Sequence, residues 1–194
     1  TRGSANPSRT SLSSPRGIAL DAGGNLYVAD SGNNRVLRYP RPVDQSGRIT
    51  PDLVIGQANF TSSISAAVSA FSLNTPAGIA LDADGNLFVA DSGNNRVLEF
   101  PQNGTAAIRV FGQPGFTSST PSNLSSAQTL TTPQGVFVDA SSTLYVADTG
   151  ANRVMIFPNT RDAAQAGSAA AIVLGQVDFA SSAAGGGSRS RVLR

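Results

Sequence analysis

The chain has no cysteine, no histidine and no lysine among its 194 residues. Without cysteine it forms no disulfide and carries no thiol nucleophile. Without histidine it lacks the base of a serine–histidine triad and the commonest zinc ligand. Without lysine it lacks Schiff-base chemistry. We therefore expect no catalytic residue, no metal site and no cofactor in this chain, although a carboxylate-only hydrolase stays open.

Charged residues are also scarce, at 13% of the sequence, and the formal net charge is +2. A nucleic-acid binder usually shows a clustered basic face. Here the arginines are spread along the chain, and we interpret the one local cluster, Arg189, Arg191 and Arg194, as a solvated end. Nucleic acid is therefore not a favoured partner. No apolar run approaches the ~18 residues of a membrane helix, so a membrane is not expected as a partner either.

The strongest signal in the sequence is an internal repeat. Leu26–Val36 recurs at Leu87–Val97 with one change, Phe88 for Tyr27, and again at Leu144–Val154 with two changes. A Pro-x-Gly-Ile/Val stretch precedes each copy, and a Gly-Gln pair follows it. Self-similarity at this spacing is typical of an array in which each repeat is one structural unit.

Each repeat predicts four short strands separated by Gly- and Asn-rich turns. In the first repeat these are Gly17–Leu20, Leu26–Ala29, Arg35–Tyr39 and Asp52–Gly56. Four antiparallel strands per unit are the pattern of a β-propeller blade. We therefore predict an all-β propeller with three blades. The predicted blades are 15–57, 76–113 and 133–176, and the predicted connectors are 1–14, 58–75, 114–132 and a Gly/Ser/Arg tail at 177–194.

The two internal connectors are long for a compact domain. Connections of more than ~12–15 residues are uncommon and often functional. One apolar residue recurs in the connectors, three positions before each unit's proline: Leu12, Leu73 and Leu130. We expect these leucines to hold the connectors against the blade edges.

These motifs resemble the NHL-repeat family, which is named after an Asn-His-Leu run at the start of the third strand. The matching stretches are Asn34–Val36, Asn95–Val97 and Asn152–Val154, with Arg in place of His. The resemblance implies a propeller, commonly of six blades, used mostly to bind protein, RNA or another ligand. Three blades would then be half of a six-bladed ring. Some members are zinc-dependent lyases that rely on histidines, so that activity is not carried over.

One polar set recurs in every repeat: Asp30, Asn34, Arg35, Asp91, Asn95, Arg96, Asp148, Asn152 and Arg153. We expect a structural role, because residues present in every repeat usually maintain the repeat. In this interpretation each Asp caps the turn that follows it, and each Arg pairs with an Asp or a carbonyl. The alternative is a ring of charges around the propeller axis.

A phenylalanine follows each Gly-Gln pair, at Phe60, Phe116 and Phe179. We expect these rings to pack between neighbouring blades, with a ligand groove as the alternative. Asp82–Asn86 resembles part of a calcium loop but lacks the distal acidic ligand, so we interpret it as a hairpin turn.

The sequence therefore favours a binding or scaffold module for protein or another ligand. The alternatives are part of a propeller enzyme whose catalytic residues lie outside this chain and, less favoured, RNA binding. Three blades would leave two sheet faces uncovered, each about 300 Å². We expect self-association, or further blades of a longer chain, to cover them. The absent lysine and cysteine and the many Ser, Thr and Asn residues favour an extracellular or periplasmic bacterial protein.

Overall fold

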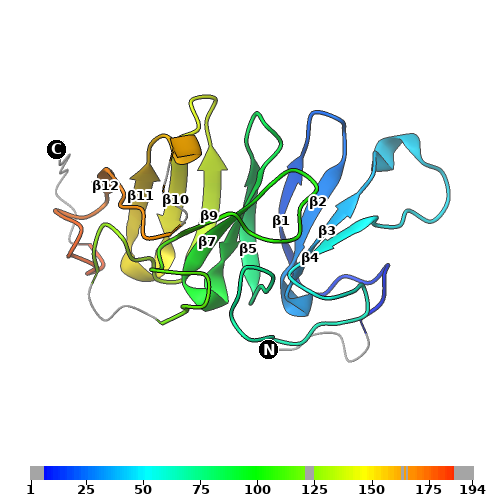
Figure 1. Cartoon of the computed structure of the whole chain (residues 1–194), viewed down its shortest axis with the longest axis horizontal. Helices are drawn as coiled ribbons and strands as arrows, with labels where there is room; N and C mark the ends of the chain where they lie inside the picture. The colour runs from blue at the N-terminus through cyan, green and yellow to red at the C-terminus, as the bar shows by residue number, and fades with distance from the viewer. Residues whose placement is uncertain (1–6, 121–124, 163, 165, 186–194) are drawn as a thin grey trace.

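A computed structural model describes residues 7–120, 125–162, 164 and 166–185. Its strands form three separate four-stranded antiparallel sheets, and within each sheet the strands follow one another in chain order (Figure 1). The remaining regular structure in this part of the chain is short 3-10 helix, and no helix there is long and apolar enough to cross a membrane. The predicted all-β architecture of three blades is confirmed. The cluster of Arg189, Arg191 and Arg194 lies outside the described residues.

The three sheets repeat the same strand lengths. The first contains β1 (Pro15–Leu20), β2 (Leu26–Asp30), β3 (Arg35–Tyr39) and β4 (Leu53–Ile55). The second contains β5 (Pro76–Leu81), β6 (Leu87–Asp91), β7 (Arg96–Phe100) and β8 (Arg109–Phe111). The third contains β9 (Pro133–Val138), β10 (Leu144–Asp148), β11 (Arg153–Phe157) and β12 (Ile172–Leu174). The fourth strands are shorter than predicted, because the glycine that follows each has positive φ, as at Gly56 (φ 91°).

A 3-10 turn joins the second and third strands of every sheet. These turns are η1 (Ser31–Asn33), η3 (Ser92–Asn94) and η4 (Thr149–Ala151). The next residue adopts the left-handed conformation, as Asn34 does at φ 54°. Asparagine tolerates this conformation better than most residues, which explains its recurrence there. Asp82–Asn86 is a hairpin turn in the structure, in which the Asn86 N–H donates to Asp82 Oδ1 at 2.8 Å.

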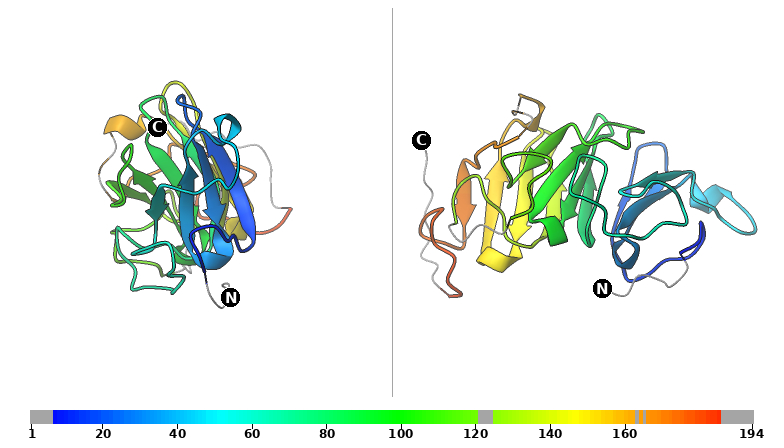
Figure 2. Two further views of the ribbon diagram at one scale, coloured as in Figure 1. Left: turned by 90° about the vertical axis from the view of Figure 1, so that its right-hand side faces the viewer. Right: turned by 60° about the horizontal axis from the view of Figure 1, so that its bottom comes forward.

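The sheets stand side by side, with the first strands β1, β5 and β9 adjacent to one another (Figure 1, Figure 2). Glycine makes this approach possible. A Cβ at Gly17 would lie 2.4 Å from the carbonyl oxygen of Ala77, and one at Gly78 would lie 2.6 Å from that of Gln134. Gly17 and Gly78 are therefore required where neighbouring first strands come close, whereas a Cβ at Gly135 would meet only the Cβ of Ala147 at 3.4 Å.

Two hydrophobic clusters fill the spaces between sheets. The blade 1–2 cluster includes Val36 and Ile55 from the first sheet and Val89 and Leu98 from the second. The blade 2–3 cluster joins the second and third sheets, and the rings of Phe111 and Phe157 meet there at 5.3 Å between centroids. The facing sides of neighbouring sheets are therefore buried against each other, as in propeller blades.

The connector leucines contribute to these clusters. Leu73 and Leu130 are buried and lie against Gly56 and Gly112, where a Cβ would come within 2.7 and 2.6 Å of the leucine side chain. The expectation that leucines hold the connectors to the blades is met at these two positions. Leu12 differs, because 43% of it is exposed.

Candidate functional site

The recurring aspartate and arginine form a buried ion pair in each blade. Arg35, Arg96 and Arg153 each place Nε 2.7 to 2.8 Å from an oxygen of Asp30, Asp91 and Asp148, and all six side chains are inaccessible to solvent. Burial raises the pKa of Asp91 and Asp148, and the paired arginines oppose this shift. In these three blades the charges are therefore buried and are not presented on the surface.

The arginine of each pair also binds the two connectors that flank its blade. Arg96 donates from NH1 to the carbonyl of Phe116 at 2.5 Å and from NH2 to the carbonyls of Ser69 and Ser72 at 3.0 Å. Arg35 makes the same set of bonds to the carbonyls of Phe60, Ser8 and Ser11. One guanidinium therefore holds together the connector before the blade and the connector after it.

The aspartates do not cap the turns that follow them, contrary to the sequence prediction. None of η1, η3 and η4 has a side-chain cap. Asp91 instead accepts the backbone N–H of Asn74, in the preceding connector, at 2.6 Å and the side-chain amide of Asn94 at 2.8 Å. A long-range bond to the connector has replaced the local cap.

The asparagine of the repeat connects adjacent blades. Asn95 donates to the carbonyl of Ser119 at 3.1 Å and accepts the N–H of Thr132 at 2.9 Å. Asn34 repeats both contacts, with the carbonyl of Ser63 and the N–H of Thr75. Asn152 likewise donates to a carbonyl of the connector after its blade, that of Ser182. These contacts support a structural role for the recurring Asp, Asn and Arg residues. That role stays a prediction.

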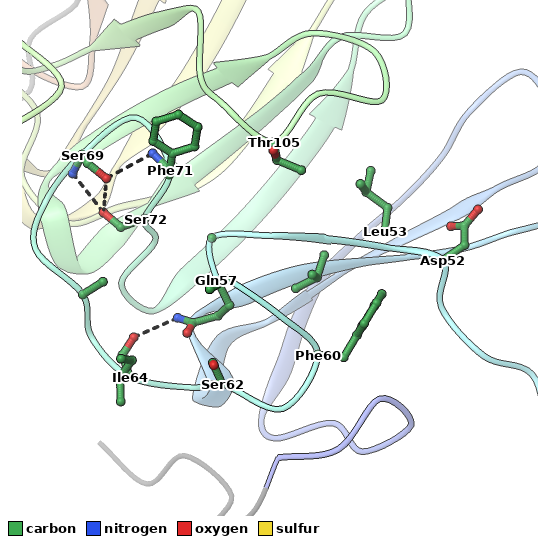
Figure 3. A pocket seen from close by; sticks show the side chains of 14 residues that line it. Asp52, Leu53, Gln57, Phe60, Ser62, Ile64, Ser69, Phe71, Ser72 and Thr105 are labelled. Atoms are coloured by element: carbon green, nitrogen blue, oxygen red, sulfur yellow. Dashed lines mark hydrogen bonds between the residues drawn. The ribbon is translucent and has the colours of Figure 1, made fainter.

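A hollow of about 590 Å³ lies where the first long connector leaves β4 (Figure 3). We call it the connector groove. It is bounded by β4, by the connector 58–75 and by the connection between β7 and β8. Its lining residues are Asp52, Leu53, Val54, Gly56, Gln57, Ala58, Phe60, Ser62, Ile64, Ala66, Ser69, Phe71, Ser72 and Thr105.

The connector groove has an apolar character with exposed large side chains on its rim. Leu53 and Val54 are half-buried, whereas Ile64 is 72% and Phe71 is 63% exposed. Exposed apolar side chains gathered around a concavity mark interaction sites more often than isolated ones do. Neither rim residue was identified from the sequence, because a single Ile and a single Phe in a Ser/Ala-rich connector form no periodic pattern.

Several polar groups in the lining are already bonded within the chain. Gln57 donates from Nε2 to the carbonyl of Ile64 at 2.8 Å (Figure 3). It also donates to the carbonyl of Asn34 at 3.1 Å, so it holds the connector against the blade. Ser69 and Ser72 bond to each other. Asp52 pairs with Arg38 at 2.9 Å. The lining therefore contains no nucleophile paired with a general base. Among the described residues no three acidic side chains are close enough together to hold a metal ion.

The three predicted phenylalanines do not share one environment. Phe60 lines the connector groove, and the guanidinium of Arg9 lies 4.5 Å from its ring centroid. Phe116 packs against the blade 1–2 cluster and Phe179 against the blade 2–3 cluster. Phe60 thus lies at the groove and the other two lie against the clusters between blades, and the roles of all three stay predictions.

Two stretches of the chain match a known repeat family. The NHL repeat family matches residues 12–39 and 73–100. No curated protein matches the chain. Both matched ranges contain a connector leucine, the buried Asp-Arg pair and the first three strands of a blade.

Solved structures share this fold at low sequence identity. Hydrazine synthase from Kuenenia stuttgartiensis superposes with a TM-score of 0.57 at 14% identity, covering 93% of this chain and 41% of that one. A protein of unknown function from Bacteroides thetaiotaomicron gives 0.53 at 17%, covering 82% and 38%. An auxiliary nutrient binding protein from the same organism gives 0.51 at 13%, covering 68% and 34%. This chain spans about two fifths of such structures or less. They include both an enzyme and a binding protein, so the fold alone does not decide between those classes.

Proposed function

We propose that this NHL-repeat protein is a binding module that holds a segment of another protein in its connector groove. The observation that carries the proposal is the pair Ile64 and Phe71, two largely exposed apolar side chains beside a hollow of about 590 Å³. Burying apolar surface of this kind is the main favourable contribution to association. NHL propellers commonly bind proteins, which agrees with this assignment.

The chemistry of the lining favours protein over nucleic acid. The lining contains no arginine, and its one charged side chain is the carboxylate of Asp52. Affinity for RNA or DNA depends on cations that neutralise phosphates. An enzyme is the weaker alternative, because its catalytic groups would have to lie away from this groove.

A peptide selection tests the proposal. Random peptides displayed on phage are selected against the wild-type chain and then measured on the double variant Ile64→Ser/Phe71→Ser. Both side chains lie at the surface, where substitutions usually change stability by no more than ~0.5 kcal/mol. Val43→Ser is the matched control, because Val43 is 90% exposed and lies in the β3–β4 connection. We expect the selected peptides to lose at least tenfold in affinity on the double variant and to keep it on the control. Equal binding to all three proteins, or no enriched peptide, would overturn the proposal.

We also propose that the two outward blade faces are covered by a blade of the same kind. On the outward face of the first sheet, Ile18 is 69% exposed and Leu20 is 65% exposed. On the outward face of the third sheet, Phe137 is 61% exposed. Phe137 lies beside Tyr145 in a shallow hollow. Their counterparts in the second blade, Ile79, Leu81 and Ala80, pack against the clusters between neighbouring blades.

A further inference from the structure

The outer edge of β8 is paired with a segment of the chain itself. Ser168 forms a parallel β-bridge with Phe111, and the N–H of Gly167 donates to the carbonyl of Gln113 at 3.3 Å. Gln128 in turn donates from Nε2 to the carbonyl of Gly167 at 2.8 Å. Residues 166–168 therefore lie along the edge strand of the second blade as a short added strand.

At the connector groove, β4 and Gln57 of the first blade occupy the positions that β8 and Gln113 occupy in the second blade. Val97 pairs with Phe111 as Val36 pairs with Ile55, so β4 and β8 share one register. Gln57 and Gln113 correspond because each donates from Nε2 to the carbonyl of the repeat asparagine at 3.1 Å.

The next connector corresponds in the same way. Ser69 and Ser126 each donate a backbone N–H to the hydroxyl three residues later, which places Phe71 where Gln128 lies. The groove thus offers the β4 edge at Ile55, the Gln57 carbonyl and the Phe71 ring. The β4 edge and the Gln57 carbonyl correspond to the backbone groups that residues 166–168 meet on β8. The Gln128 amide, which donates to the Gly167 carbonyl, has no equivalent donor here, because the Phe71 ring stands in its place and offers apolar contact instead.

A difference in one connection leaves this edge uncovered. Residues 158–171 join β11 to β12, whereas the shorter 101–108 join β7 to β8. The last residues of the two connections make equivalent bonds to the connector before their blade. The N–H of Ala170 donates to the carbonyl of Ala127, and the N–H of Ala107 donates to the carbonyl of Ala70. Before that point the shorter one turns back, with the Gly104 N–H bonded to the Pro101 carbonyl at 2.8 Å. Of this connection only Thr105 lines the groove, and the described residues form no bridge to the outer edge of β4.

From this comparison we infer that the connector groove binds an extended peptide segment of small residues, added parallel to β4 opposite Ile55. The inference rests on the proposed function and names its partner's chemistry. The segment carries glycine followed by serine or threonine, flanked by alanine-sized residues, as Ala166–Ser168 does on β8. Its glycine N–H donates to the carbonyl of Gln57. Strand addition of this kind derives affinity from main-chain bonds and selectivity from the side-chain pockets.

The conformation of Gly167 makes the inference stereochemically specific. Its φ is +72°, and a Cβ there would meet no atom within 4 Å. Space therefore does not exclude a side chain, but an L-residue is strained at this φ, whereas a D-residue favours it. The bound segment should accept D-alanine at the glycine position and disfavour L-alanine.

The probe is a synthetic capped peptide with the sequence of residues 163–170, AAQAGSAA, titrated into the isotope-labelled full chain and followed by amide NMR shifts. We expect shifts centred on Ile55, Gly56 and Gln57. The peptide with D-alanine for glycine should bind at least as tightly, and the one with L-alanine at least fivefold more weakly. A variant in which 158–171 replaces 101–108 should lose the shifts, because its own chain would cover β4. If that graft does not fold, Ile64→Ser/Phe71→Ser takes its place.

The outcomes separate this inference from the proposed function. If selected peptides bind the groove but AAQAGSAA leaves these amides unmoved, strand addition by small residues is wrong and the binding function stands. Equal affinity of the D- and L-alanine peptides would overturn the proposed register. Failure of both the selected peptides and AAQAGSAA would remove the binding function together with the inference.

Discussion

Arg96 lies with its Nε 2.7 Å from Oδ2 of Asp91, and solvent reaches neither side chain. The carboxylate also accepts the N–H of Asn74, and the guanidinium also donates to three connector carbonyls. The pair therefore joins strand, turn and both connectors in one network. Removing one partner leaves the other charge buried without compensation.

We accordingly expect Asp91→Ala to lower the free energy of unfolding by about 3–5 kcal/mol. Asp84→Ala is the control, because Asp84 pairs with Arg161 at the surface, where both side chains are more than half exposed. Exposed pairs contribute about 0–1 kcal/mol. Urea denaturation of both variants measures the difference. A loss below 1 kcal/mol for Asp91→Ala would contradict the structural role of the pair.

Glycine at the blade junction gives a second prediction. A Cβ at Gly78 would lie 2.6 Å from the Gln134 carbonyl oxygen and 2.9 Å from the Cα of Gly135. Both atoms belong to the backbone of β9, so the first strands would have to separate. We expect Gly78→Ala to cost about 1–3 kcal/mol, as overpacking typically does. Gly115→Ala, where a Cβ meets nothing within 4 Å, should cost far less. Equal thermal midpoints for the two variants would argue against close contact of β5 with β9.

Glu99 gives a prediction about pH. Burial raises the pKa of this carboxyl above its usual value, although Arg109 at 3.0 Å opposes the shift. A raised pKa in the folded state means that folding favours the protonated acid. The resulting contribution to stability is complete below the unfolded pKa of about 4.5 and is lost as pH rises through the folded pKa. No hydrogen-bond partner reaches Glu99 Oε2 within the described residues, which agrees with the cost of burying the charged form.

We therefore expect Glu99→Gln to lose less stability than the wild type between pH 4.5 and pH 7. The amide has nearly the same shape but does not titrate, so the comparison isolates the proton. Urea midpoints at the two pH values provide the measurement, and Asp84→Asn controls for a surface carboxylate. A wild type and a Glu99→Gln variant with parallel pH profiles would show that Glu99 does not titrate differently in the folded chain.

The blades could be predicted because their information is local and repeated. Leu26–Val36 carries two strands and the turn between them, and its near-identical copies gave the same interpretation three times. The role of Asp91 was only partly predicted. Its bond to the Asn74 N–H joins residues 17 positions apart through a backbone donor, and such a donor leaves no mark on the side-chain pattern.

The connector groove could not be predicted from any single segment. It exists because the β7–β8 connection turns back at Gly104 while its counterpart in the third blade extends past Gln113. Only the spatial superposition of two repeats shows that one edge is covered and the other is open. Phe71 gains its position from that same packing, since it takes the place that Gln128 has in the next connector.

We expect the outward faces of the first and third sheets to fit each other, because equivalent faces pack together between the first and second blades. In the blade 1–2 cluster, Ile79 and Leu81 share one hydrophobic environment with Ala19. Ile18 and Leu20 are the first-blade counterparts of Ile79 and Leu81, and Phe137 is the third-blade counterpart of Ala19. The face that carries Ile18 and Leu20 should therefore fit the face that carries Phe137 on another copy. Two three-blade arcs that meet head to tail at both ends form a closed ring.

We consequently expect the isolated chain to self-associate at micromolar concentration, with a dimer as the dominant species in light scattering. Leu20→Glu and Phe137→Glu should each shift the population to monomer, because each places a charge in an apolar contact. Val43→Glu should leave the dimer intact, since Val43 is 90% exposed and lies in the β3–β4 connection, not on an outward sheet face. Association that resists both face variants would assign the contact to another surface. A non-aggregating wild-type monomer would show that the two faces need no second blade, and the proposal of blade-to-blade closure would then be wrong.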